Sequence, residues 1–515
     1  LREVKHLDNL DAATVNRYAD EARVLRAIAY FHAIDNFGNV PFADETAVVG
    51  VNPEQISRAD LFAWLETELK DIIANGKLPE RGSVEYGHAG MGAAKFLLAK
   101  LYLGAEVYTG TARWNDCATI LKDLMDDGYS LHTTPNGTIY NAYQDLFLAD
   151  NDRCTDEIIF AVQQDGLYTQ SYGVTNYLVF ASTGGTMNVN DLGISSGWGG
   201  LRATPEFVDK FTSGDARYLL YDSEKSIADI QAMPETPEER GDSEKTIKQL
   251  KEKGTYEDEC KKLRETKEAA LKDNVQEKSV DDIGNFKYGY GFQKFRNVTS
   301  TGEIPNRVFD EENGTWGNPG FVNTDFPMMR YADVLLMAAE IANEQGDLSY
   351  AKNCLRQVRE RAYIDNEDEA DAYVNAIGSK DEMFNAIVDE RALEFCGEFL
   401  RKADLIRWNL LKSKLDEAAD DMLALRDLQG GYSNLTGDIC YTLAADERSI
   451  DITFLSYGDE IPAGAEVSTG YVNKYDDGKK SGFYYDRIKG IYYRNPEQYM
   501  FWPIFNDTMT NSQGY

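Results

Sequence analysis

The sequence predicts a mainly α fold, in which tetratricopeptide-like helical repeats form a scaffold for a loop-rich region with short strands. Residues 325–362 show the repeat pattern, because small and apolar residues recur there at i, i+3, i+4 and i+7 on both sides of Gly346. Residues 89–127 follow the same plan around Gly110. Each segment has the size of one helical hairpin, and a single hairpin cannot bury its own apolar faces. Stacked hairpins are therefore expected.

The helices before residue 129 follow from amphipathic periodicity and from glycines that stop helices. We expect a long first helix over residues 8–37, ending at Gly38, and a second helix over residues 61–73. A helical hairpin over residues 93–127 follows. Residues 1–128 are accordingly predicted to be one group of tetratricopeptide-like helices.

The chain changes character after residue 128. Residues 129–220 are rich in Gly, Ser, Thr, Asn and aromatic residues, with strand-like runs at 157–163 and 177–182. We assign residues 129–325 to a loop-rich binding region, because long ordered loops commonly carry function. Within this region, residues 222–282 are dense in Glu, Lys and Asp. They predict a solvated helical insertion, a hairpin that turns near Gly254.

The last part of the chain begins with helices and ends without clear periodicity. Helices are expected at residues 327–362 and 379–411, so residues 326–411 form a second predicted group of tetratricopeptide-like helices. Residues 412–515 are predicted to be an irregular tail that packs on the scaffold.

Residues 389–408 are predicted to form one highly charged helix. Glu398/Arg401, Arg401/Asp404 and Asp404/Arg407 all stand at i, i+3. Apolar residues interleave with these charges as packing positions, which favours a structural ion-pair network over a ligand site.

The charge balance limits the class of partner. The chain has 53 Lys and Arg against 87 Asp and Glu, a net charge of −34, and such a surface repels nucleic acid. The 6 cysteines are dispersed and form no CxxC motif, so neither a zinc site nor a disulfide framework is expected. No apolar run is long enough to span a membrane. We expect no cofactor and leave a structural calcium ion open.

One formal catalytic motif occurs, a GxSxG match at residues 193–197. A nucleophile elbow needs a preceding strand and a later histidine, but no histidine follows Ser195. The 87 acidic residues allow so many carboxylate pairs that no chosen pair is informative. The sequence gives no argument for an enzyme.

Aromatic residues in polar loops are the main candidates for ligand contacts. The chain is 12% aromatic with 31 Tyr, and rings in Gly- and Asn-rich loops cannot all belong to the core. Flat rings suit sugars, whose apolar ring faces stack on them. The predicted platform consists of Trp198, Trp316, Tyr288 and Tyr290, with Tyr168, Tyr172 and Tyr177 as second-choice members.

Four segments resemble the SusD/RagB family of Bacteroidetes surface lipoproteins. They are EARVLRAIAYFHAIDNFGNVPF (21–42), RYADVLLMAAEIANEQGD with the following RQVRERA helix, ER-x-x-EF-x-x-E-x-x-R-x-x-DLIRW (390–408) and YMFWPIFNDTMTNSQGY (499–515). GWGGLRATPEF (197–207) also fits. The chain departs from the family pattern at Phe399 and Leu400, where Gly and His are common, and in the last segment.

The resemblance implies a single SusD-like fold that binds a glycan without turnover. It implies a cell-surface location on the outer membrane, with a lipid anchor on residues that would precede Leu1. The implied partners are an oligosaccharide or polysaccharide and a SusC-like TonB-dependent transporter barrel, to which the glycan is delivered. Two alternatives stay open: a peptide-capturing member of the same scaffold, and a tetratricopeptide-like module whose groove binds a protein.

Overall fold

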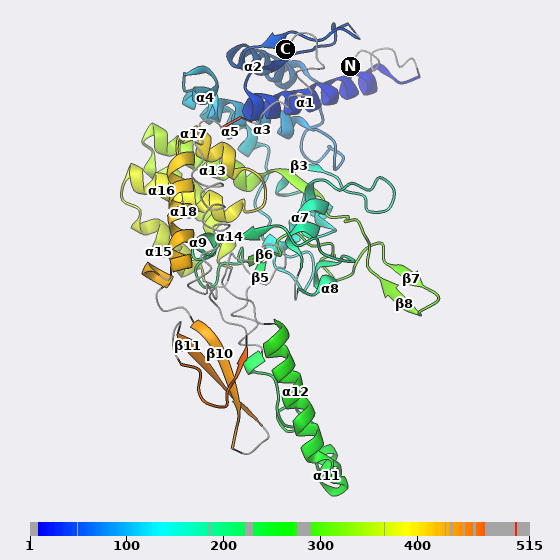
Figure 1. Cartoon of the computed structure of the whole chain (residues 1–515). Coiled ribbons are helices and arrows are strands. Elements are labelled where there is room, and N and C mark those ends of the chain that lie inside the picture. The colour runs from blue at the N-terminus through cyan, green and yellow to red at the C-terminus, as the bar shows by residue number, and fades with distance from the viewer. Residues whose placement is uncertain are drawn as a thin grey trace.

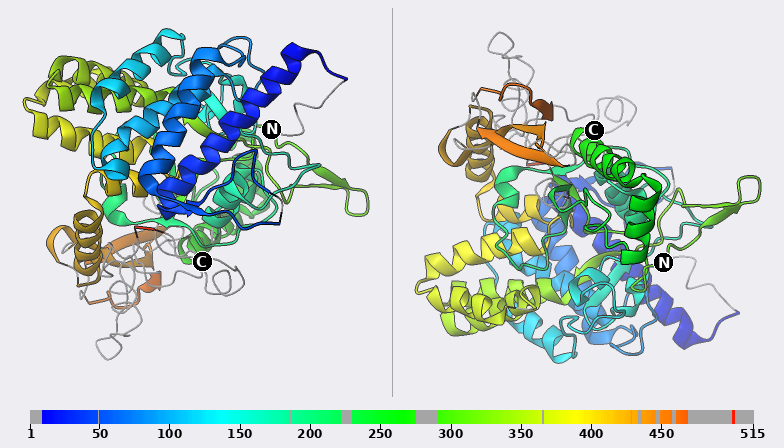
Figure 2. Two further views of the ribbon diagram at one scale, coloured as in Figure 1. Left: turned by 90° about the horizontal axis from the view of Figure 1, so that it is seen from above. Right: turned by 90° about the horizontal axis from the view of Figure 1, so that it is seen from below.

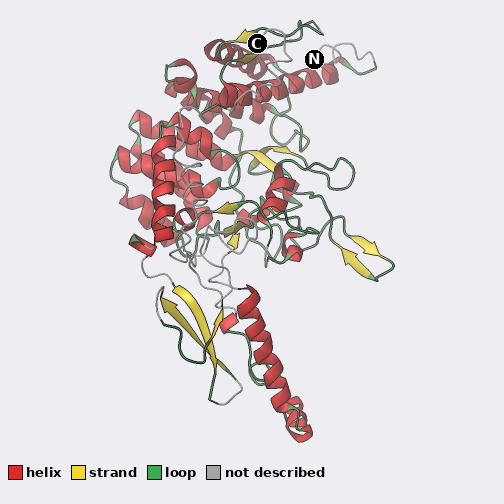
Figure 3. Ribbon diagram, in the orientation of Figure 1, coloured by secondary structure: helices red, strands yellow, loops and turns green. Residues whose placement is uncertain are grey.

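The computed structural model describes residues 9–48, 50–184, 187–221, 230–274, 290–364, 366–427, 429–432, 436–445, 449–456, 460–468 and 500–501. Helices dominate it and the strands are short (Figures 1 and 3), so the prediction of a mainly α fold is confirmed. A loop-rich region lies beside the stacked helices, and a helical arm with a small sheet extends from it (Figure 1).

Two of the N-terminal helices end at the glycines that the sequence indicates. They are α1 (Ala12–Phe37), α2 (Arg58–Asn75), α3 (Met91–Leu103), α4 (Ala105–Thr109) and α5 (Trp114–Asp126), and an antiparallel pair of β1 (Val40–Pro41) and β2 (Gln55–Ile56) lies between α1 and α2. Asp11 begins α1 by accepting a hydrogen bond from the amide of Thr14. Gly38 ends α1 with φ of 74°, and Gly110 ends α4 with φ of 78°.

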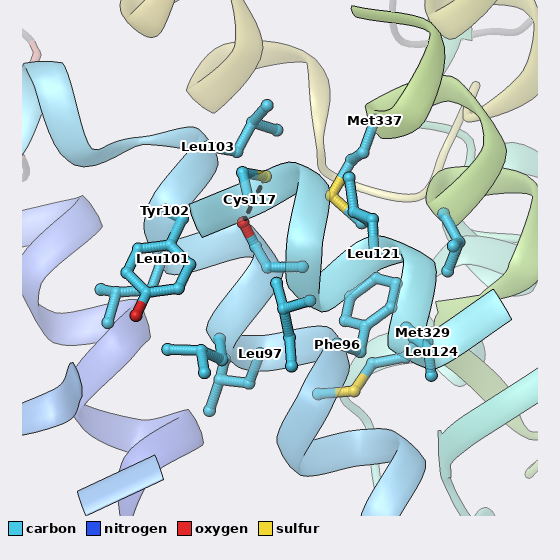
Figure 4. Packing of buried hydrophobic residues seen from close by; sticks show 14 of the residues in the cluster. Phe96, Leu97, Leu101, Tyr102, Leu103, Cys117, Leu121, Leu124, Met329 and Met337 are labelled. Carbon is cyan, nitrogen blue, oxygen red and sulfur yellow. Dashed lines mark hydrogen bonds between the residues drawn. The ribbon is translucent and has the colours of Figure 1, made fainter. Parts of the chain in front are cut away.

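The two groups of helices form one stack. The second group contains α13 (Tyr331–Gln345), α14 (Leu348–Ala362), α15 (Glu367–Ala376), α16 (Lys380–Glu394) and α17 (Arg401–Arg407). α1 packs on α2, α2 on α3, α3 on α5, and α5 packs in turn on α13. Figure 4 shows part of the shared core, which includes Leu121 and Leu124 of α5 and Met337 of α13. Each fully buried leucine contributes roughly 1.5–3 kcal/mol, which holds the hairpins together.

The region between the helix groups has a second apolar core and only short elements. Its elements are α6 (Ala142–Asp145), β3 (Ile158–Val162), α7 (Val174–Ser182), α8 (Val189–Leu192), β4 (Arg202–Ala203), α9 (Pro205–Val208), β5 (Leu220–Tyr221), β6 (Tyr290–Phe292), β7 (Val308–Asp310), β8 (Thr315–Gly317) and β9 (Phe326–Arg330). β3 pairs antiparallel with β9, and β6 pairs antiparallel with β4 and β5. β7 and β8 form a separate hairpin that projects from the body (Figures 1 and 2).

Two expectations about secondary structure are wrong in this part of the chain. The apolar run at residues 177–182, predicted as a strand, belongs to helix α7. A short continuous apolar run does not distinguish a buried strand from a buried helix, and most of α7 is buried. The helix expected from residue 327 begins at Tyr331, because residues 326–330 pair with β3 as strand β9.

The single helix predicted over residues 389–408 is also wrong. α16 ends at Glu394 and α17 begins at Arg401. Gly397 and Phe399 between them have φ of 77° and 63°, which a right-handed helix cannot accommodate.

The predicted ion-pair network is confirmed, although its partners differ. Asp404 and Arg407 pair at 2.9 Å as expected. Glu398 instead pairs with Arg330 and Lys294, at 2.8 and 2.7 Å, because the break after α16 separates it from the helix that carries Arg401. Arg401 donates to the carbonyl of Val388 at 2.8 Å.

Buried ion pairs join β9, α14 and α16. Arg330 ends β9 and lies 2.6 Å from Glu157 and 3.0 Å from Glu394. Glu394 also pairs with Arg361 of α14 at 2.5 Å, and Arg361 returns to Glu157 at 2.8 Å. These pairs tie the loop-rich region to the helical scaffold.

The charged insertion and the last part of the chain pack on one another. The described part of the insertion contains α11 (Glu244–Lys253) and α12 (Tyr256–Asn274), which turn at Gly254 with φ of 70° as predicted. α11 has no buried residue. Leu271 of α12 shares an apolar cluster with Tyr441 and Ile450 from the end of the chain.

The expectation of an irregular tail is wrong in its described part. Residues 411–468 contain α18 (Leu411–Asp427) and the strands β10 (Thr436–Leu443), β11 (Ile450–Ser456) and β12 (Glu466–Ser468), in the sheet order β11-β10-β12. Ile450, Ile452 and Phe454 alternate with other residues at the strand period, a signal that sequence reasoning missed. The sheet buries its apolar face on the insertion, which is distant in sequence.

Candidate ligand-binding site

Trp198 is fixed at the C-terminal end of α7 by its backbone. The amide of Trp198 donates to the carbonyl of Phe180 at 2.7 Å, and the amides of Gly200 and Leu201 each donate to the carbonyl of Ala181 at 2.8 Å. These bonds satisfy carbonyl groups that the end of a helix leaves without partners. The position of α7 therefore fixes the position of the loop that carries Trp198.

Gly197 is required because the Trp198 loop lies so close to the end of α7. A Cβ atom at this position would stand 2.1 Å from the carbonyl oxygen of Thr183, far inside any normal contact. Gly197 thus serves the backbone packing of the loop as well as the exposure of the indole ring.

Three of the predicted aromatic residues meet in one cluster. The ring centroid of Trp198 lies 6.2 Å from that of Tyr172 and 6.4 Å from that of Tyr177. All three side chains reach solvent, with exposed fractions of 46%, 68% and 44% for Trp198, Tyr172 and Tyr177. We call these three residues the aromatic cluster. They present partly exposed ring faces to which an apolar ligand surface can stack.

Two further rings support the cluster, and sequence reasoning missed both. Phe180 of α7 lies 5.1 Å from Trp198, and Phe321 lies 4.9 Å from Tyr172, centroid to centroid. Phe321 follows a Gly-rich stretch like that around Trp198, so the same criterion would have found it. The strand pattern predicted around Phe180 hides its relation to Trp198, because that relation depends on the end of a helix.

The backbone around Tyr172 is strained on both sides. Gln170 has φ of 30° and Val174 has φ of 48°. A β-branched residue such as Val174 rarely adopts positive φ, and such conformations persist only where the surrounding structure imposes them. The amide of Val322 donates to the side chain of the buried Asn176 at 3.0 Å, which anchors the start of α7 beside this strained segment. The position of Tyr172 is therefore built into the fold.

A cavity of about 470 Å³ adjoins the cluster, since Tyr172 and Tyr177 are among its lining residues. It lies between α1, α3, α7, β9 and the turn at Phe399, and most of its walls are apolar. The charged groups in the wall are paired: Lys100 lies 3.1 Å from Asp333, and Glu398 binds Arg330. Although burial opposes it, the nearby cations Arg391 and Lys100 lower the pKa of Asp333. The cavity therefore presents little uncompensated charge.

The other predicted site residues lie apart from this cluster. Trp316 is on β8, where its ring packs on that of Phe309 at 5.1 Å. Tyr168 is 85% exposed in the loop before Tyr172, and Asp165 shapes this loop by accepting hydrogen bonds from the amides of Leu167 and Tyr168 at 2.8 and 3.0 Å. A ligand-binding role for Trp316, for Tyr168 and for the three residues of the aromatic cluster stays a prediction.

Tyr288 lies outside the described residues, and Tyr290 begins β6, where its backbone pairs with Ala203. The side chain of Tyr290 is likewise outside the described part of the structure.

The described residues form neither a serine-hydrolase motif nor a metal site. Gly193 of the GxSxG match ends α8 in the left-handed conformation, and the amide of Ser195 donates to the carbonyl of Pro319, so the segment is not a strand-turn-helix elbow. Within the described ranges, no group of three or more His, Cys, Asp or Glu side chains is arranged to hold a metal ion. None of the described helices is both long and apolar enough to cross a membrane.

Comparisons with known proteins identify the family of the chain. The sequence model of the SusD family matches residues 156–515. The chain is 27% identical over 442 residues to the starch-binding protein SusD of Bacteroides thetaiotaomicron, covering 84% of this chain and 70% of that protein. The SusD-like protein P25 of Formosa agariphila is 25% identical over 421 residues, covering 79% of this chain and 67% of that protein.

Solved structures share the fold at low sequence identity. Surface glycan-binding protein A from Bacteroides thetaiotaomicron, in complex with laminarihexaose, aligns with a TM-score of 0.52 and 17% identity over 80% of this chain and 73% of that chain. A SusD-like protein from Bacteroides fragilis aligns with a TM-score of 0.51 and 19% identity over 80% of this chain and 73% of that chain. Since the family match extends over well more than half of the sequence, this chain belongs to the SusD family.

Proposed function

We propose that this protein captures oligosaccharides at the cell surface and delivers them to a SusC-like TonB-dependent transporter in the outer membrane. The observation that carries the proposal is the aromatic cluster of Trp198, Tyr172 and Tyr177, whose rings are partly exposed although their backbone is firmly held. The starch-binding relative and the neighbour solved with laminarihexaose support a glycan as the ligand.

The geometry suits sugar binding for a physical reason. Tilted rings offer apolar faces at several angles, and the C–H faces of a sugar pack on such rings while its hydroxyls stay hydrated or bind polar neighbours. Because the backbone of Trp198 is already pinned to α7, binding orders few additional groups, and this limits the entropic cost. The protein binds the glycan without cleaving it and without a cofactor. A lipid anchor attached to residues before Leu1 would hold it at the outer leaflet.

Affinity electrophoresis of the purified protein tests this function. Gels would contain starch, laminarin or an acidic polysaccharide, and the variants would be Trp198→Ala and Tyr172→Ala. Tyr350→Ala is the matched control, because Tyr350 is 44% exposed on α14, away from the cluster. We expect one glycan class to retard the wild type and the control, and each cluster variant to migrate faster.

Three results would contradict the proposal. Equal retardation of the wild type and Trp198→Ala would exclude the cluster as the site. Release of shorter sugars would show an enzyme. If no glycan retards the protein and it binds members of a peptide library, the peptide-capturing alternative is favoured.

A further inference from the structure

The β7–β8 hairpin presents a second aromatic surface. Phe309 and Trp316 are cross-strand partners in its register, so their side chains project from the same face. They remain 46% and 57% exposed although their rings touch at 5.1 Å. Among the described strands, β7 and β8 pair with each other and with no third strand, and the hairpin projects from the body (Figures 1 and 2). Packing within the hairpin therefore leaves much of this aromatic face uncovered.

The base of this hairpin is tied to the loop that carries Trp198. The side-chain amide of Asn318 donates to the side chain of Asn190 at 2.9 Å and to the carbonyl of Ile194 at 3.1 Å. The amide of Ser195 donates to the carbonyl of Pro319 at 3.1 Å. The aromatic surface of the hairpin and the aromatic cluster thus stand on two segments that are bonded side by side.

These bonds limit the distance between the two tryptophans. Trp316 precedes Pro319 by three residues, and Trp198 follows Ser195 by three residues. An extended chain spans at most about 3.6 Å per residue, so the Cα atoms of Trp198 and Trp316 lie within about 30 Å of each other. One extended polymer chain can bridge any separation within this limit, so the two aromatic surfaces lie within reach of a single polysaccharide.

The negative charge of the hairpin limits the kind of polymer that could bind there. Its turn contains Asp310, Glu311 and Glu312, all exposed, in a protein with a net charge of −34. A polyanionic chain would be repelled at this turn, and an uncharged chain would not. The ligand chemistry that fits both aromatic surfaces is that of a neutral polysaccharide.

We propose that the β7–β8 hairpin is a second contact for the same glycan, so that the protein prefers neutral polysaccharides long enough to span the aromatic cluster and the hairpin. This inference rests on the proposed glycan-binding function. Once the cluster holds a long chain, contact with the hairpin becomes intramolecular, and the effective concentration raises the overall affinity without any change at the cluster. A short oligosaccharide gains nothing from the hairpin.

The test compares a polymer with its own trisaccharide by titration calorimetry: soluble starch with maltotriose, and laminarin with laminaritriose. The variants are Trp316→Ala and the double variant Phe309→Ala/Trp316→Ala. Trp316→Phe keeps a ring at the position, and Tyr350→Ala is the control on α14. We expect Trp316→Ala to weaken polymer binding on the order of tenfold or more and to leave trisaccharide binding unchanged. Trp316→Phe should retain most of the polymer affinity.

Each other outcome has a definite meaning. If Trp316→Ala leaves the ratio of polymer to trisaccharide affinity unchanged, the hairpin is not a second contact, while the proposed function stands. Equal weakening for both ligands would place Trp316 within a single short site and would also overturn the inference. If the wild type binds neither polymer but an acidic polysaccharide retards it in the gels, the inference of a neutral polysaccharide fails and the proposed function stands. If no glycan binds, or if Trp198→Ala binds both ligands as well as the wild type does, the proposed function itself fails. Unchanged circular dichroism and melting temperature would show that the hairpin variants remain folded.

Discussion

Replacing Glu394 by glutamine tests whether the buried ion pairs hold the loop-rich region on the helical scaffold. The carboxylate is fully buried and lies 3.0 Å from Arg330 and 2.5 Å from Arg361. Burial alone would raise the pKa of Glu394, but the charges of Arg361, Arg330 and Arg217 outweigh it and lower this pKa from 4.5 to about 2. Since each pKa unit corresponds to about 1.36 kcal/mol, this lowering corresponds to roughly 3 kcal/mol of stability.

The expected loss in the Glu394→Gln variant is about 3–5 kcal/mol of unfolding free energy at pH 7, because buried guanidinium groups then lack their countercharge. The assay is urea unfolding followed by circular dichroism, with the midpoint and slope compared between proteins. The pKa of Glu394 is depressed in the folded state, so its contribution is present above about pH 4.5 and is lost as the pH falls towards 2. The difference between wild type and variant should shrink over this interval.

An exposed pair provides the control. Lys122 and Asp126 pair on the surface of α5 with side chains 76% and 65% exposed, so Asp126→Asn should leave the unfolding free energy nearly unchanged. A loss below about 1 kcal/mol for Glu394→Gln would refute the reasoning. So would a loss that stays constant from neutral to acidic pH.

Further predictions concern the Trp198 loop and a buried histidine. Gly197→Ala should lower stability by about 1–3 kcal/mol and weaken glycan retention, because the new Cβ would stand 2.1 Å from the oxygen of Thr183. Gly200→Ala should change neither property, since nothing lies within 4 Å of its Cβ position. If Gly197→Ala and Gly200→Ala had the same effect in thermal melts and affinity gels, the steric explanation for Gly197 would be wrong. Although burial opposes protonation, the carboxylates of Asp145 and Asp156, which lie 3.5 and 2.9 Å from the ring nitrogens, raise the pKa of His132 to about 12. The stabilisation by His132 is complete below about pH 6.5 and declines as the pH rises, so His132→Asn should flatten the fall of unfolding free energy between about pH 7 and pH 9. An unchanged slope would contradict this assignment.

The sequence predicted the features that depend on neighbouring residues. Helical periodicity and the stops at Gly38, Gly110 and Gly346 located the hairpins, because amphipathic spacing and left-handed glycines act within a few residues. The turn of the insertion at Gly254 was found for the same reason. Motifs in the scaffold helices and in the GWGG segment indicate the SusD family by their residues alone, because each motif is contiguous in the chain.

The tertiary structure decided which predicted aromatic residues meet. Trp198 joins Tyr172 and Tyr177 because its loop bonds to the end of α7, a helix whose local pattern suggests a strand. Trp316 pairs with Phe309 on a hairpin of its own. The first arrangement depends on contacts that the local pattern does not specify. The second is a local hairpin around Asn313 and Gly314, a turn signal that sequence reasoning missed.

The sequence by itself thus determined the helical scaffold and the chemistry available in its loops. The tertiary structure decided the ends of the charged helix near Phe399, the sheet that covers the insertion, and the division of the aromatic residues into two surfaces. The physical reason is the range of the interactions. Helix periodicity and turn conformation are local, whereas burial, ion pairing and strand pairing take their free energy from partners elsewhere in the chain.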